Sequence, residues 1–123
     1  MRVTSNSELG QRGEDAAAQL LLKKGYRLVA RNYRTRYGEI DIIARKGGFL
    51  VFVEVKFRRS SKFGTPQEAV NARKQQHMIR SALSYVKQHS LFNESIRFDV
   101  LSIGPDTSEI IESAFIADSR YTY

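Results

Sequence analysis

Apolar residues in the first 25 positions recur at the spacing of an amphipathic helix. The positions that follow this spacing are Leu9, Ala16, Ala17, Leu20 and Leu21. Ser5 or Ser7 precedes them as a capping residue, and Gly25 stands where helices commonly end. The pattern therefore predicts one helix that runs to about Lys24.

The pattern then changes to short runs of aromatic and aliphatic residues, which are typical of strands. We expect these strands at residues 26–33, 38–44 and 49–57. The last two form a hairpin, because Gly47 and Gly48 between them accept the positive φ that tight turns require. In the third strand the valines point to one face, and Phe52, Glu54 and Lys56 point to the other.

A second helical region follows a basic loop. Thr65-Pro66-Gln67-Glu68 is typical of a capping box with proline at the first helical position. Helical periodicity continues to Val86, with a break near Asn71 left open. Two further strands are expected at residues 96–103 and 110–117. This order predicts a single α/β domain over residues 1–123, with a central mixed sheet of about five strands flanked by helices.

Composition narrows the class of protein. The 123 residues match one domain, and a net charge of +7 favours a polyanionic partner. The chain has no cysteine, which excludes disulfides, thiolate nucleophiles and cysteine-based zinc sites. We find neither a signal peptide at the N-terminus nor a run of about 20 apolar residues that would span a membrane. A soluble cytoplasmic protein is therefore expected, without a membrane partner.

The expected hairpin brings two carboxylates together. If Gly47 and Gly48 form a two-residue loop, counting back along both strands places Asp41 opposite Glu54. Directly opposed side chains have Cβ atoms roughly 4.5–5.5 Å apart, where like charges are destabilising. A hard divalent cation such as Mg²⁺ or Mn²⁺ would remove this repulsion. Alternatively, Lys56, on the same face as Glu54, pairs with one of the two carboxylates at a sheet edge.

These residues also carry a family resemblance. Asp41 followed by Glu54-Val55-Lys56 resembles the metal-binding signature of the PD-(D/E)XK nuclease superfamily. Together with Gly13-Glu14 and the Gly-Glu-Ile-Asp-Ile-Ile segment at 38–43, the pattern is more closely similar to the YraN-like bacterial family. That family is regarded as endonuclease-like and akin to archaeal Holliday-junction resolvases. Ile40 stands where the superfamily name places proline. The resemblance implies a restriction-endonuclease-like fold.

The resemblance also assigns roles to individual residues. It implies that Asp41 and Glu54 are metal ligands, with the main-chain carbonyl of Val55 and the helix residue Glu14 as further ligands. Lys56 would be the catalytic lysine beside them. The implied cofactor is Mg²⁺ or Mn²⁺.

Basic residues flank both carboxylates along the chain. Those expected to contact a nucleic-acid backbone are Arg34, Arg36, Arg58, Arg59, Lys62, Arg73 and Lys74. The aromatic residues Tyr33, Tyr37 and Phe63 lie among them and either stack on bases or pack in the fold. An ordinary basic surface is the alternative interpretation.

Three other residues are given no functional role. His77 and His89 lack the spacing of paired zinc ligands. Asp99 is interpreted as a charge at the edge of the core.

Three functions remain open, of which the last is an interaction adaptor that would show no affinity for DNA even at low salt. The first is a metal-dependent endonuclease acting on DNA that is branched or otherwise structured, for which symmetric cleavage predicts a homodimer. The second is a non-catalytic nucleic-acid-binding module of a DNA-processing complex. Carboxylates that converge on an ion-sized gap favour the enzyme, whereas splayed or salt-bridged carboxylates favour the binding module.

Overall fold

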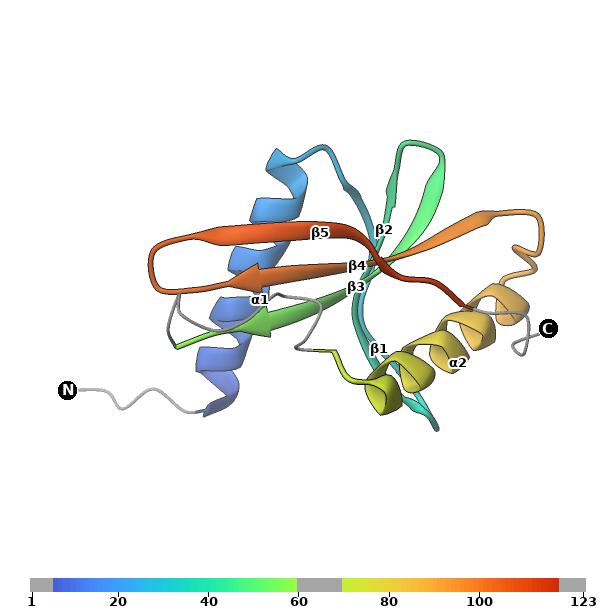
Figure 1. The fold of residues 1–123 in the computed structure, drawn as a ribbon, viewed down its shortest axis with the longest axis horizontal. Helices are drawn as coiled ribbons and strands as arrows, with labels where there is room; N and C mark the ends of the chain where they lie inside the picture. Colours follow the sequence, from blue (N-terminus) through green and yellow to red (C-terminus); the bar gives the residue numbers. More distant parts are fainter. Residues whose placement is uncertain (1–5, 60–69, 118–123) are drawn as a thin grey trace.

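The sheet contains all five expected strands. The computed structural model describes residues 6–59 and 70–117 (Figure 1). Its elements, in chain order, are α1 (Asn6–Lys23), β1 (Arg27–Thr35), β2 (Gly38–Lys46), β3 (Phe49–Phe57), α2 (Ala72–Gln88), β4 (Ser95–Ile103) and β5 (Ser108–Phe115). The strand order is β1-β2-β3-β4-β5; β3 and β4 are parallel, and the other pairs are antiparallel. The predicted α/β fold with a mixed sheet is confirmed.

The two helices cover opposite faces of this sheet. Ala17 and Leu21 of α1 pack against Val51 and Val53, whereas the buried residues of α2 pack around Phe52. The alternation along β3 thus supplies both halves of the core, since successive side chains of a strand point to opposite faces. Figure 1 shows α1 passing behind β3, β4 and β5. Neither helix has the length and apolar character needed to cross a membrane, within the described ranges.

The described helix α2 begins at Ala72, directly after the break noted near Asn71. The Thr65–Glu68 capping box lies outside the described residues. Asn71 is the N-cap of α2, and its side chain accepts a hydrogen bond from the backbone N–H of Lys74 at 2.9 Å. Asparagine is among the strongest N-cap residues, because its short side chain satisfies a free N–H group of the first turn. The break near Asn71 is therefore the beginning of the described helix.

The β1–β2 connection is shorter than the stretch of residues 34–37 left between the first two expected strands. Thr35 pairs with Gly38, so only Arg36 and Tyr37 form the turn. Thr35 Oγ1 accepts a hydrogen bond from the N–H of Tyr37 at 3.0 Å, and Gly38 takes a φ of +137°. This local hydrogen bond and the glycine make a two-residue connection feasible. The turn consequently carries Arg36 at its tip.

The β2–β3 hairpin has the predicted register. Lys46 pairs with Phe49 and Ile42 pairs with Val53, on either side of a turn in which Gly47 and Gly48 both have positive φ. The ladder ends at the Ile42–Val53 pair. The next position on each strand is a carboxylate, so the two acidic residues lie where β2 and β3 separate.

Candidate functional site

At the end of β3, the side chain of Asp41 accepts a backbone hydrogen bond that a neighbouring strand would otherwise accept. Its Oδ2 atom accepts a hydrogen bond from the backbone N–H of Val55 at 2.8 Å. The residues of β3 from Glu54 to Phe57 then pair only with β4, at Val100–Ile103. The N–H and carbonyl of one strand residue point to the same side. The Val55 carbonyl therefore faces the side on which Asp41 lies.

Glu54 is the more deeply buried partner of this acidic pair. Its side chain is only 13% exposed, and its Oε2 atom lies 3.3 Å from the ammonium nitrogen of Lys74 on α2. This contact is not aligned as a hydrogen bond, and the buried Oε2 atom has no aligned donor among residues 6–59 and 70–117. The ion pair thus only partly satisfies the carboxylate.

The ionisation of the two carboxyl groups is linked. Burial, and then the charge of Asp41, raise the pKa of Glu54 to about 7, although Lys74 opposes this rise. Burial also raises the pKa of Asp41, against the opposing effect of the Val55 N–H. The pair therefore retains a proton at pH values where exposed carboxyl groups have lost theirs.

This arrangement fits a hard divalent cation. Such ions prefer carboxylate and carbonyl oxygen atoms as ligands. Asp41 and Glu54 supply two carboxylates, the Val55 carbonyl faces their side, and Oε2 of Glu54 is a buried acceptor without an aligned donor. A bound cation would compensate the charges that the protein keeps close together here.

Lys56 lies beyond this pair on the same strand. Strand alternation places it on the same face of β3 as Glu54, and it is exposed where Glu54 is largely buried. The Lys56 side chain is therefore exposed on the face of β3 that also carries Glu54.

Glu14 has partners of its own on β1. Its Oε2 atom accepts a hydrogen bond from Asn32 Nδ2 at 3.1 Å, and the guanidinium of Arg31 lies 3.8 Å away. In the described part of the chain, no three acidic or histidine side chains form a group that could hold a metal ion. The structure thus brings together Asp41 and Glu54 but places Glu14 in a polar contact with β1.

The predicted nucleic-acid-binding residues are spread over several elements. Arg34 forms an ion pair with Glu39 at 3.2 Å, and Lys74 forms the pair with Glu54 that the sequence did not indicate. Arg58 and Arg59 follow β3, and Arg73 is exposed in the first turn of α2. Lys62 lies outside the described residues, as does Phe63.

Comparison with known proteins identifies the family. A family model described as "Uncharacterised protein family UPF0102" matches residues 13–103. The chain belongs to the UPF0102 family. It is 51% identical over 98 residues to a UPF0102 protein of Syntrophomonas wolfei, which covers 80% of this chain and 85% of that protein. It is 48% identical over 114 residues to one from Symbiobacterium thermophilum, covering 89% and 97% respectively.

One solved structure is also similar to this UPF0102 protein. Its title is "Crystal structure of SSO0001", and the match covers 94% of this chain and 55% of that one, at 22% identity and a TM-score of 0.45. The matches within UPF0102 confirm the YraN-like resemblance seen in the sequence.

The UPF0102 protein also contains a buried polar network that the sequence did not reveal. Asp99 is fully buried, so its interpretation as a charge at the core edge is wrong. It accepts hydrogen bonds from the Tyr26 hydroxyl at 2.6 Å, from Arg97 at 2.8 and 2.9 Å, and from the Ser113 N–H at 3.0 Å. Burial and the bond to Asp99 raise the pKa of Tyr26 well above its ordinary value. This network joins the two strands β4 and β5 to the end of the α1–β1 connection.

The raised pKa of Glu54 predicts how stability changes with pH. Without divalent cations, the folded UPF0102 protein holds this proton up to about pH 7, whereas the unfolded chain releases it near 4.5. The folded state binds more protons in this window, so raising the pH favours unfolding. We expect the free energy of unfolding to fall by up to about 3 kcal/mol across it.

Urea unfolding in EDTA across this window measures the effect, with Glu54→Gln as the comparison because it cannot titrate. The expected result is a shallower pH dependence in the variant. Equal slopes for the two proteins would contradict the assignment of the raised pKa to Glu54.

Proposed function

We propose that this UPF0102 protein is a divalent-metal-dependent endonuclease that hydrolyses phosphodiester bonds in DNA. The observation that carries the proposal is the convergence of Asp41 and Glu54 where the β2–β3 ladder ends. Two largely buried carboxylates with raised pKa values are unfavourable for the fold by itself. Such pairs are typical of sites that serve chemistry.

Each residue of the pair has a separate task in this proposal. When bound, Mg²⁺ or Mn²⁺ supplies a water molecule of lowered pKa and positive charge beside the phosphoryl oxygens. Asp41, already oriented by the Val55 N–H, and Glu54 would hold the ion, together with the Val55 carbonyl. Glu54 would give up its proton and its contact with Lys74 in order to do so.

Lys56 would act on the substrate. Its ammonium group would position the attacking water or stabilise negative charge that develops on the phosphate. Glu14 was expected as a further ligand. It would join only by exchanging its hydrogen bond with Asn32, so the proposal assigns the first ligands to β2 and β3.

The charge of the chain indicates the type of substrate. With a net charge of +7, and with Arg58 and Arg59 following Lys56, phosphate contacts would dominate binding and would weaken as salt increases. Such contacts position DNA but do not read its sequence. The proposed substrate is therefore defined by shape, as in branched or structured DNA. A homodimer would supply the two sites that symmetric junction cleavage needs.

One observation favours a second function. The ammonium of Lys74 lies at Glu54, as expected if the acidic pair served only the fold. In that case the protein would be a non-catalytic nucleic-acid-binding module of a DNA-processing complex.

A cleavage assay separates these two functions. Labelled duplex, single-stranded, flap and four-way-junction DNA are incubated with the protein in Mg²⁺, Mn²⁺ or EDTA. The endonuclease proposal predicts cutting in either metal and none in EDTA, with the strongest cutting on a branched substrate. Binding of every substrate without cutting in any metal would support the binding module instead.

A further inference from the structure

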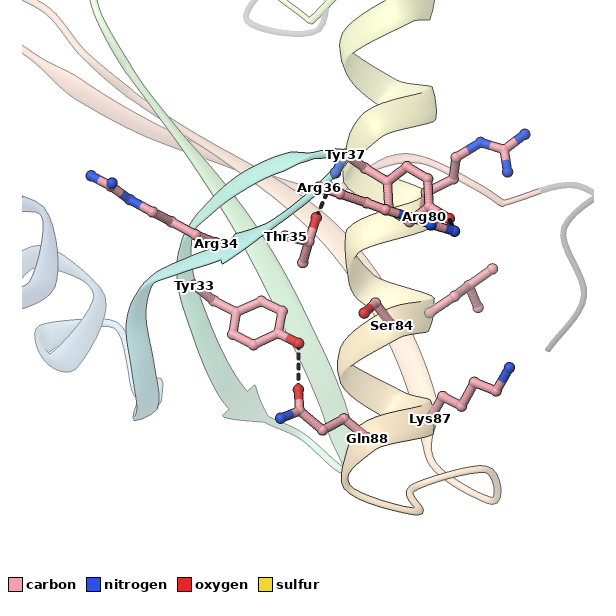
Figure 2. Close-up of a pocket in the computed structure, with 10 residues that line it drawn as sticks. Tyr33, Arg34, Thr35, Arg36, Tyr37, Arg80, Ser84, Lys87 and Gln88 are labelled. Carbon is pink, nitrogen blue, oxygen red and sulfur yellow. Dashed lines mark hydrogen bonds between the residues drawn. The ribbon is translucent and has the colours of Figure 1, made fainter.

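A basic cleft lies between the β1–β2 turn and the outer side of α2. Figure 2 shows the residues that line it. Its volume of about 560 Å³ is within the usual range for small-molecule sites. Ten described residues line it; four are arginine or lysine, and none is acidic. A cleft of this composition attracts an anionic ligand.

Two arginines meet on one aromatic ring at the mouth of this cleft. The guanidinium of Arg36 lies 4.9 Å from the centroid of the Tyr37 ring and donates a 2.7 Å hydrogen bond to its hydroxyl. The guanidinium of Arg80 on α2 lies 5.9 Å from the same centroid. Planar guanidinium groups bind phosphate through paired hydrogen bonds. Because both guanidinium groups lie against the Tyr37 ring, a phosphate at this point would have two of them close by.

A second aromatic ring forms the floor of the cleft. The hydroxyl of Tyr33 donates a 2.7 Å hydrogen bond to Gln88 Oε1 (Figure 2). The Tyr33 ring also packs edge-on against the ring of Tyr85, with 5.2 Å between their centroids. Leu83 adds apolar surface to the same lining. A fixed aromatic ring of this kind is a platform on which nucleobases stack, whatever their sequence.

A stripe of exposed basic residues runs along α2 from the cleft toward the helix turn whose Lys74 contacts the acidic pair. Arg73, Arg80 and Lys87 recur at intervals of seven along α2, which places them on one side of the helix. Lys74, next to Arg73, contacts Glu54. From Lys74 to Arg80 the helix rises by about 9 Å, a length close to three nucleotides of a DNA strand at 3.4 Å each.

We propose that this cleft binds an unpaired nucleotide of a DNA strand that lies along α2. Arg36 and Arg80 hold its phosphate, and its base lies against the ring of Tyr33. This inference rests on the proposed function and deepens it, because it names the structural element of the DNA that the protein recognises. The shared chemistry is that of a nucleoside monophosphate, either in a strand or free in solution. The basic stripe favours the strand.

Fluorescence anisotropy in EDTA tests this inference, because binding is then measured whether or not the protein cleaves DNA. The probes are a labelled duplex with one unpaired adenosine in its middle and the same duplex without it. We expect the bulged duplex to bind about ten-fold more tightly, as stacking of one base implies. Arg80→Gln should remove most of this preference, and so should Tyr33→Leu.

Arg73→Gln is the matched control. It removes the same charge from the same stripe, but Arg73 does not line the cleft. It should weaken binding of both duplexes equally and leave their ratio unchanged. Circular dichroism melting of each variant shows that the fold is retained.

Two results with the duplex probes would overturn the inference. One is equal affinity of the wild-type protein for both duplexes. The other is an Arg80→Gln variant that keeps the preference for the bulged duplex. Tight binding of free dAMP, without tighter binding of the bulged duplex, would indicate that the cleft binds a free nucleotide. That result would also overturn the proposal that it binds a nucleotide within a DNA strand. Absence of cleavage on any DNA would contradict the proposed function and leave this binding comparison intact.

Discussion

Replacing Glu54 by glutamine is expected to reduce metal-dependent DNA cleavage by on the order of 10³-fold or more. Glutamine keeps the shape of the side chain but removes the charge that would hold a divalent cation beside Asp41. DNA binding should persist, because the basic residues that contact the backbone are unchanged. Single-turnover cleavage in Mg²⁺, together with anisotropy in EDTA, measures the two properties separately.

Glu109→Gln provides the comparison for this experiment. Glu109 is an exposed residue of β5, so its replacement makes the same change in charge away from the acidic pair. The cleavage rate of this variant should equal that of the wild-type protein. If Glu54→Gln also cleaved at the wild-type rate, Glu54 would not be part of the active site.

Replacing Asp99 by alanine should destabilise the fold by about 3–5 kcal/mol, as is typical when one partner of a buried ion pair is removed. The change leaves the largely buried guanidinium of Arg97, the hydroxyl of Tyr26 and the N–H of Ser113 without their shared acceptor. Each of these buried donors then lacks an acceptor, so the free energy of its removal from water is no longer offset by a hydrogen bond. Chemical denaturation followed by circular dichroism measures this loss.

Asp106→Ala is the control for this measurement, since Asp106 is exposed in the β4–β5 turn. It should change stability by less than about 0.5 kcal/mol. A loss of less than about 1 kcal/mol in Asp99→Ala would show that the network contributes little to folding.

The sequence predicted the β2–β3 hairpin well because local rules determine it. The side-chain period of two and the glycines at 47 and 48 together fix the register, and the register places Asp41 beside Glu54. The strand bounds of β3 were predicted for the same reason. This part of the candidate site needs no information from distant segments.

The partners of the site residues could not be predicted in this way. Lys74 reaches Glu54 from a different element, and Asn32 binds Glu14 from a backbone position with a φ of +53°. The hydrogen bond between Tyr26 and Asp99 joins residues 73 positions apart. Such contacts depend on how helices and strands pack in three dimensions, which periodicity does not encode.

The cleft on α2 was only partly visible in the sequence. Arg36, Tyr33 and Tyr37 were noted as basic and aromatic neighbours, but Arg80 and Lys87 were not assigned. Their spacing of seven from Arg73 is a signal that a helical projection of residues 72–88 would have revealed. What the projection cannot show is that the β1–β2 turn lies beside that face of the helix.

The hydrogen bond from the Val55 N–H to Asp41 has a spectroscopic consequence. The amide nitrogen of Val55 lies 2.8 Å from Oδ2 of Asp41, and the carbonyl of the same residue faces the same side. The chemical shift of this amide in a nitrogen-15 NMR spectrum would respond when Glu54 loses its proton and when a cation binds beside Asp41. The Val55 amide can therefore be used to follow both events by NMR, with nitrogen-15 as the sole label.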